Sequence, residues 1–149
     1  MKHEKILVVE DDPHLSSLIV EILKIEGYCA IENAANGLEG FEKYKALRPD
    51  LVLMDMSMPI MNGYESSQKI KQFDPNANII ILTGNPRDDN AQKIMGEGYA
   101  SILLQKPFMI SFLVENIRQL LASQSSNVLI SPKDTGYVHS NSVKSFQCA

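Results

Sequence analysis

The chain of 149 residues has little cysteine, no tryptophan and no long apolar run. Its two cysteines, Cys29 and Cys148, form no CxxC pair and no metal-type spacing, so we expect two reduced thiols and neither a disulfide framework nor a zinc site. The apolar runs fall far short of the ~20 residues that a membrane helix needs, and no basic and apolar leader begins the chain. A cytoplasmic location is therefore expected.

An excess of positive charge is also missing. The formal net charge is −4, whereas proteins that bind nucleic acid usually present a basic face. We therefore expect no direct contact with nucleic acid and no membrane insertion. The content of 44% hydrophobic and 21% charged residues is typical of a globular protein, and the length suits one domain.

What the chain does contain is an alternation of short apolar runs with helical patterns. Runs that read as strands cover residues 6–9, 28–32, 51–54, 78–82 and 101–104, and a helical pattern follows each of them. Strands that are apolar throughout are buried on both faces, which favours a parallel sheet with helices on each side. The predicted fold class is α/β, a doubly wound (βα)5 sandwich whose five-stranded parallel sheet has the common order 2-1-3-4-5.

The composition changes at about Ser123. The last 27 residues contain seven serines and no helical stripe, and they are too few to build a second core. We therefore expect one domain over residues 1–122 and a flexible serine-rich tail over residues 123–149, so that no DNA-binding or enzymatic domain is expected in the residues after 122. The apolar patch at residues 128–130 can instead dock on the domain or on a partner. The tail neither proves nor excludes that the chain is part of a longer protein.

Polar residues gather where the predicted strands end. Glu10 and Asp11 follow the first strand, Asp55 the third, Thr83 the fourth and Lys106 the fifth. Sites in parallel open sheets form beyond the carboxyl ends of the strands, where the strand order reverses. Since the predicted order puts the first and third strands side by side, we expect the three acids to meet in one shallow cleft, with Thr83 and Lys106 approaching from the next two strands.

This set of residue types suits phosphoryl chemistry. Three adjacent carboxylates repel one another unless a positive group compensates them, and Mg²⁺ is commonly held by one or two carboxylates and a phosphate oxygen. A remaining carboxylate can then act as a nucleophile, while Lys106 neutralises phosphoryl oxygens and Thr83 donates its hydroxyl to one of them. The set is what an aspartyl phosphate requires.

Each residue taken alone has a simpler explanation. Asp55 suits a turn after a strand, Glu10 and Asp11 suit the start of a helix, Thr83 suits a turn before glycine, and Lys106 suits a solvated charge. The joint placement of a complementary set at four of the five strand ends favours a functional site.

Four motifs in this order resemble the receiver domain of two-component response regulators. They are ILVVEDD (residues 6–12), DLVLMDMSMPIMNGYE (50–65), IIILTG (79–84) and QKPF (105–108), and the resemblance covers about residues 3–122. It implies a flavodoxin-like fold and an aspartate that accepts a phosphoryl group from a histidine kinase or a phosphotransfer protein.

The motif positions imply a role for each residue. Asp55 matches the phosphoacceptor. Asp11, Asp55 and the backbone carbonyl of Ser57 would bind Mg²⁺ directly, and Glu10 would act through a water molecule. Asp12 lies outside the acidic pair and suits a helix cap.

The resemblance extends to the switch residues, with one departure. Thr83 and Lys106 match the switch hydroxyl and the lysine of the family, in which the peptide bond before Pro107 is typically cis. The family usually places an aromatic residue three positions before the lysine, but Leu103 stands there and Tyr99 lies further back. Either Leu103 makes the conformational response to phosphorylation weaker, or the response is transmitted through a different contact.

The loop that follows Asp55 has to turn sharply before a helix begins. Pro59 fixes one torsion angle, and the pair Asn62-Gly63 is expected to permit positive ones. The methionines at positions 54, 56, 58 and 61 are expected to pack in the core and at its rim, with contact to a partner as the alternative.

The expected function is a phosphorylation-operated, stand-alone switch that signals by binding another protein. We expect no conventional enzyme, only self-phosphorylation from phosphodonors and autodephosphorylation. The alternative is a phosphoryl relay or phosphate sink without an output partner. A phosphohydrolase is disfavoured because such enzymes commonly place a second aspartate two residues after the nucleophile, where this chain has Ser57. A dimer that forms on phosphorylation is left open.

Overall fold

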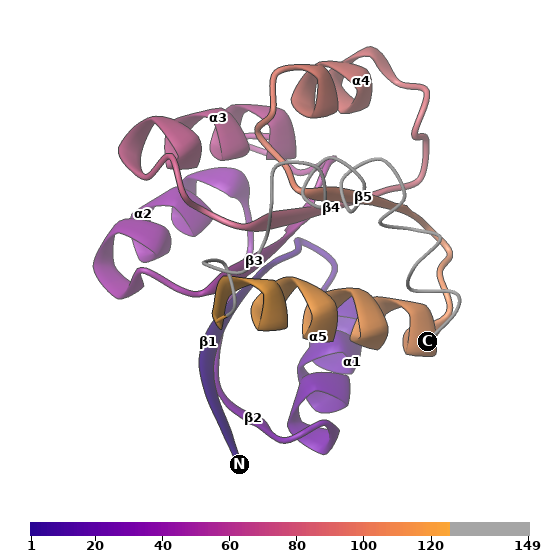
Figure 1. Cartoon of the computed structure of the whole chain (residues 1–149). Coiled ribbons are helices and arrows are strands. Elements are labelled where there is room, and N and C mark those ends of the chain that lie inside the picture. Colours follow the sequence, from indigo (N-terminus) through magenta and orange to yellow (C-terminus); the bar gives the residue numbers. More distant parts are fainter. Residues whose placement is uncertain (126–149) are drawn as a thin grey trace. The chain divides into compact units, whose positions relative to one another are not determined.

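The computed structural model of the protein describes residues 1–125 (Figure 1). These residues fall into two compact units, Met1–Pro107 and the segment from Phe108 onward, which are described separately. Of the tail predicted for residues 123–149, the first three residues lie in the last helix, and the rest, including the apolar patch at residues 128–130, lies outside the described residues.

The first unit is built on a single parallel sheet. Its strands are β1 (Lys2–Val9), β2 (Tyr28–Ala34), β3 (Leu51–Asp55), β4 (Ile79–Thr83) and β5 (Ile102–Gln105). They lie in the order β2-β1-β3-β4-β5, which confirms the predicted order and fold class. The register pairs Val9 with Met54 and Asp55 with Leu82, so the carboxyl ends of β1, β3 and β4 meet at one edge of the sheet.

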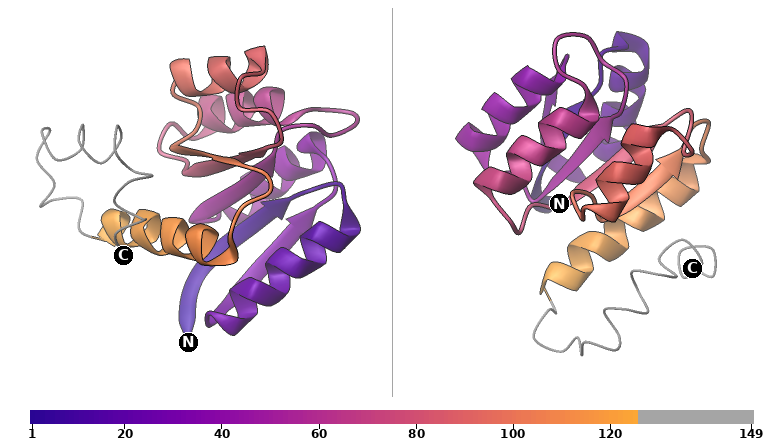
Figure 2. Two further views of the ribbon diagram at one scale, coloured as in Figure 1. Left: turned by 90° about the vertical axis from the view of Figure 1, so that its right-hand side faces the viewer. Right: turned by 90° about the horizontal axis from the view of Figure 1, so that it is seen from above.

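Four helices cover the two faces of this sheet. They are α1 (Pro13–Ile25), α2 (Gly37–Leu47), α3 (Gly63–Phe73) and α4 (Asp89–Gly96). Helices α2, α3 and α4 lie side by side on one face, and α1 lies on the other (Figures 1 and 2). The central strands β3 and β4 are buried along their whole length, which explains why they are apolar until their last residues, whereas β2 is partly exposed and carries polar residues.

The core beneath α2, α3 and α4 is formed by alternate residues of the strands. Its buried strand residues include Leu7, Val9, Val52, Met54, Ile79 and Ile81, which pack with Tyr44, Ile70 and Ile94 of the helices. On the other side, α1 buries Ile19, Ile22 and Leu23. A rigid sheet of this kind holds the ends of its strands in fixed positions.

Helix starts follow local sequence signals. The carboxylate of Asp12 accepts the backbone N–H of His14 at 2.9 Å and caps α1, whose first residue is Pro13. This confirms Asp12 as a cap outside the acidic pair. Asn62 caps α3 and forms a reciprocal capping box with Glu65.

The second unit contributes one further helix, α5 (Ile110–Ser125). Of the helices in residues 1–125, none combines the length and the apolar character that crossing a membrane requires.

Candidate functional site

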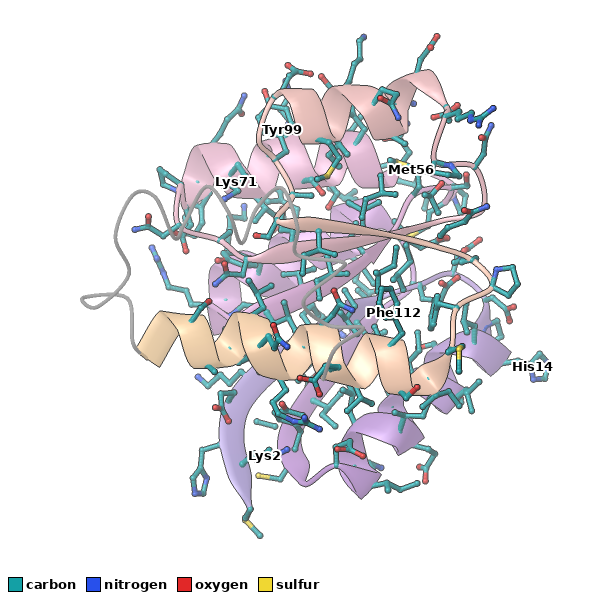
Figure 3. All side chains as sticks on the ribbon, turned by 45° about the vertical axis from the view of Figure 1, so that its right-hand side comes forward. Lys2, His14, Met56, Lys71, Tyr99 and Phe112 are labelled. Atoms are coloured by element: carbon teal, nitrogen blue, oxygen red, sulfur yellow. The ribbon has the colours of Figure 1, made fainter. Side chains whose placement is uncertain are left out.

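Three acidic side chains meet at the carboxyl edge of the sheet. Glu10 and Asp11 directly follow β1, and Asp55 is the last residue of β3. One carboxylate oxygen from each lies within 4.8 Å of the others. Glu10 and Asp55 are buried, whereas Asp11 is exposed. The predicted meeting of the three acids is therefore confirmed, while His14 projects outward from the start of α1 and takes no part in this cluster (Figure 3).

Lys106 bridges two of these acids. Its ammonium Nζ lies 2.7 Å from Oδ1 of Asp55 and 3.3 Å from Oε1 of Glu10. The backbone helps to place it, since the N–H of Lys106 donates to the carbonyl of Thr83 at 2.7 Å. The peptide bond between Lys106 and Pro107 is cis, as predicted.

Burial sets the charge state of this cluster. It raises the pKa of Glu10 from 4.5 to about 7, because the hydrogen bond from the backbone of Asp12 and the charge of Lys106 offset only part of the lost hydration. Burial also raises the pKa of Asp55, against the opposing effect of Lys106. For Lys106 itself, burial lowers the pKa, but the hydrogen bonds and charges of the two acids outweigh it and the pKa is raised. One ammonium thus compensates the cluster only in part.

The donor set fits a hard divalent cation. Carboxylate oxygens are the ligands that Mg²⁺ prefers, and three of them converge within a few ångströms at an edge that water can reach through Asp11. Ser57 lies exposed in the loop after Asp55. A pocket of about 280 Å³ borders Glu10 and Asp11, but its other lining residues come from α1, from β2 and the loop after it, and from α2, and Asp55 and Lys106 are not among them.

Thr83 is buried at the end of β4, and its hydroxyl is engaged by its own loop. The hydroxyl donates to the carbonyl of Asn85 at 3.2 Å and accepts the N–H of the same residue at 3.1 Å. These local hydrogen bonds are of the kind expected from the simpler explanation of Thr83, a turn before Gly84. The hydroxyl must therefore leave Asn85 before it can donate to another group.

The loop after Asp55 turns at a residue that the sequence did not indicate. The positive torsion lies at Ile60, with φ 71°, where the N–H of Met61 donates to the carbonyl of Pro59 at 2.7 Å. The expectation of positive torsions at Asn62-Gly63 was wrong. Asn62 is extended, with φ −80°, because it caps α3.

Gly63 is required for a different reason. A Cβ atom at this position would collide with the backbone carbonyl of Asp55. The N–H of Gly63 also donates to the carbonyl of Met56 at 2.9 Å. The first residue of α3 is therefore held directly against the end of β3.

Leu103 and Tyr99, the aromatic residue that precedes it in the sequence, have different surroundings. Leu103 pairs with Ile81 in the sheet and is partly buried against the core. Tyr99 lies in the α3–α4 region, with its ring 5.9 Å from that of Tyr64 (Figure 3). The hydroxyl of Tyr64 donates to Glu97 at 2.6 Å. The sequence did not indicate these contacts, since nothing in the local pattern distinguishes Tyr64 from a surface residue of a helix.

Comparisons with known proteins agree with this geometry. The model of the response regulator receiver domain family matches residues 6–118. The sporulation initiation phosphotransferase F of Bacillus subtilis is 36% identical over 126 residues, which cover 85% of this chain and 100% of that protein.

Solved structures give the same result. The crystal structure of a CheY-like response regulator receiver domain protein from Methanospirillum hungatei JF-1 has a TM-score of 0.79 and 30% identity, covering 85% of this chain and 99% of that one. The response regulator protein TrrA of Thermotoga maritima, crystallised in complex with Mg²⁺ and BeF, has a TM-score of 0.69 and 34% identity, with coverages of 78% and 98%.

The chain belongs to the response regulator receiver family. It is a CheY-like receiver domain of two-component signalling, with the flavodoxin-like fold of that family.

Proposed function

We propose that this protein is a switch operated by phosphorylation of Asp55 in the presence of Mg²⁺. The observation that carries the proposal is the contact of the buried Asp55 carboxylate with Lys106 at 2.7 Å, within a cluster that also holds Glu10 and Asp11. Formation of an aspartyl phosphate requires a nucleophilic carboxylate, a lysine beside it and a cation site next to it, and this cluster provides residues of all three kinds.

The transfer step follows from these positions. A carboxylate oxygen of Asp55 attacks the phosphorus of a phosphohistidine, a P–O bond forms, and the P–N bond breaks with its electron pair left on the histidine nitrogen. Mg²⁺ would be held by Asp11 and Asp55 directly, with the Ser57 carbonyl, and by Glu10 through water, and it would neutralise phosphoryl oxygens. Lys106 would exchange its contact with the Asp55 carboxylate for a phosphoryl oxygen.

The hydroxyl of Thr83 would respond to phosphorylation of Asp55. The new group carries about −1.5 to −2 charges by analogy with other phosphoryl groups, so it attracts hydroxyl donors. When the Thr83 hydroxyl turns to it, the hydrogen bonds with Asn85 are lost and the loop before α4 is released. The surface formed around α4 would then differ between the two states.

Mass spectrometry of the intact protein tests the proposal. Incubation with MgCl₂ and acetyl phosphate should add one phosphoryl group to the wild type and none to Asp55→Asn. Asp12→Asn is the matched control, since asparagine still caps α1 and this acid lies outside the cluster. No adduct on the wild type, or an undiminished adduct on Asp55→Asn, would refute the assignment.

A second candidate is a phosphoryl relay, and the similarity to sporulation initiation phosphotransferase F favours it. A relay or sink would pass on or hydrolyse the phosphoryl group, whereas a switch would keep it long enough to bind a cytoplasmic protein partner. The lifetime of the adduct after removal of acetyl phosphate separates a sink from a switch or a relay. A lifetime of seconds indicates a sink, and one of many minutes indicates a switch or a relay that awaits its acceptor.

A further inference from the structure

The loop that carries the site is held by a residue far away in the sequence. Gly37, the first residue of α2, donates its backbone N–H to the carbonyl of Met61 at 3.0 Å. The first N–H groups of a helix have no partner within the helix, so this one is free to bind the loop. Helices α2 and α3 lie side by side, which brings this contact to the point where the loop enters α3 (Figures 1 and 2).

Only glycine fits at this position. A Cβ atom on residue 37 would collide with the carbonyl oxygen of Met61 and lie 2.9 Å from its carbonyl carbon. It would also lie 3.0 Å from the carbonyl oxygen of Asn62. Since these are backbone atoms, they cannot turn away as a side chain can, and the loop itself would have to move.

A buried serine of α3 forms a hydrogen bond with the same glycine. The hydroxyl of Ser66 on α3 donates to the carbonyl of Gly37 at 2.8 Å, in a fully buried position. Its neighbour Ser67 is equally buried, but its hydroxyl has no hydrogen-bond partner among the described residues. Of these two adjacent serines, only Ser66 ties α3 to α2.

Gly37 and Ser66 fix one end of the loop, and the sheet fixes the other. The N–H of Met56 donates to the carbonyl of Leu82 at 3.0 Å, which continues the ladder between β3 and β4 one residue beyond Asp55. Residues 57–60 therefore span two anchored points, Met56 on the sheet side and Met61 on the helix side. A displacement of Met61 would be transmitted to Ser57 and to the orientation of the Asp55 backbone.

We propose that Gly37 and Ser66 form a clamp whose function is to position the loop 56–61 for binding of Mg²⁺. They are positioning residues, since neither touches the cation, and the inference rests on the proposed function in that the acidic cluster takes Mg²⁺. Residues behind the direct ligands of a metal commonly set its affinity, and their loss costs about 10–100-fold.

Two variants weaken the clamp to different degrees. Gly37→Ala pushes the loop carbonyls aside and should raise the Kd for Mg²⁺ by about tenfold. Ser66→Ala removes one hydrogen bond without adding an atom and should raise it by up to about fivefold, the value of one net hydrogen bond. Isothermal titration calorimetry with MgCl₂ gives the Kd, and circular dichroism confirms that each variant is folded.

The chain offers a matched control for each variant. Ser67→Ala removes a buried hydroxyl that forms no hydrogen bond to the loop, and Gly96→Ala adds a Cβ at a helix position with no heavy atom within 4 Å. Both should bind Mg²⁺ with the wild-type Kd. The rate of adduct formation from acetyl phosphate, measured at increasing MgCl₂ concentration, is a second test. Ser66→Ala should need more MgCl₂ than the wild type to reach its half-maximal rate, but at saturating MgCl₂ the two rates should be equal.

The outcomes distinguish this inference from the proposed function. Wild-type protein that binds Mg²⁺ and forms the adduct, together with a Ser66→Ala variant whose Kd equals that of Ser67→Ala, would overturn the clamp alone. A loss of stability in Ser66→Ala without a change in Kd would also overturn it, because the role would then be structural only. Wild-type protein that neither binds Mg²⁺ nor forms an adduct would overturn the proposed function as well.

Discussion

The ammonium of Lys106 and the carboxylate of Asp55 form an ion pair of 2.7 Å that joins the end of β5 to the end of β3. The same ammonium lies 3.3 Å from Glu10, so it serves two buried acids at once. Asp11 adds a third carboxylate to this cluster. Carboxylates therefore outnumber ammonium groups in the cluster, which adds to the effect of burial in raising the pKa of Glu10 and Asp55 and favours the cation binding that we propose.

Replacing Lys106 by methionine should slow phosphorylation of Asp55 strongly. The variant keeps a side chain of similar length but cannot stabilise charge on the phosphoryl oxygens, and loss of one such group costs about 100-fold in rate. The initial rate of adduct formation from acetyl phosphate, measured by mass spectrometry, checks this. Lys24→Met, which changes an exposed lysine on α1, should retain the wild-type rate. A rate for Lys106→Met close to that of Lys24→Met would contradict the role of Lys106.

The stability of the protein should fall as pH rises, and Mg²⁺ should oppose this fall. The pKa of Glu10 is raised from 4.5 to about 7 by burial, so the folded protein keeps a proton that the unfolded chain releases. Its contribution to stability is complete below about pH 4.5 and is lost as pH passes through about 7. The raised pKa of Asp55 acts in the same direction. Urea unfolding should therefore give a lower free energy of unfolding at about pH 8 than at about pH 5.

Two measurements isolate the part of this pH dependence that comes from Glu10. Saturating MgCl₂ should restore stability most at the higher pH, where the carboxylates are charged and available as ligands. Glu10→Gln has no carboxylate at this position and should flatten the pH dependence, whereas Glu21→Gln, at an exposed position of α1, should leave it unchanged. An unchanged slope in Glu10→Gln would show that other groups cause the effect.

Thr83→Ala should still accept a phosphoryl group but should not transmit the change to the loop before α4. In the unphosphorylated protein the Thr83 hydroxyl is bonded to Asn85, and we expect phosphorylation to draw it away. Hydrogen exchange of residues 84–88 should therefore increase on phosphorylation in the wild type and in Thr83→Ser, which keeps the hydroxyl. In Thr83→Ala exchange should be fast in both states. Equal exchange in phosphorylated and unphosphorylated wild type would contradict this mechanism.

The strands of the sheet and the charged residues at their ends were predictable because both depend on local patterns in the sequence. Apolar runs located all five strands, and the positions directly after them located Glu10, Asp11 and Lys106. What the sequence did not indicate depends on contacts between distant segments. The hydrogen bond from Gly37 to Met61 is one example, because it joins the start of α2 to the loop after β3, two segments with no shared motif.

The positive torsion at Ile60 was unpredictable for the same reason. Isoleucine is branched at Cβ and disfavours φ above zero, so local propensity favours Asn62 or Gly63 instead. The loop nevertheless turns at Ile60, because Gly63 is held against Asp55 and Asn62 is held as the cap of α3. Because both ends of the loop are held in place, the positive φ falls on Ile60, between Pro59 and Met61.

Ile60→Asn should therefore stabilise the protein. Asparagine tolerates φ of 71° better than isoleucine, and a residue held in such a conformation costs of order 1–3 kcal/mol, so we expect a gain of about 1 kcal/mol in the free energy of unfolding. Little apolar burial is lost, because Ile60 is 77% exposed. Urea unfolding measures the change, with Ile25→Asn as the matched control: Ile25 is 79% exposed but helical, and asparagine there should give no gain. A loss of stability in Ile60→Asn would show that the isoleucine side chain contributes contacts that outweigh its backbone strain.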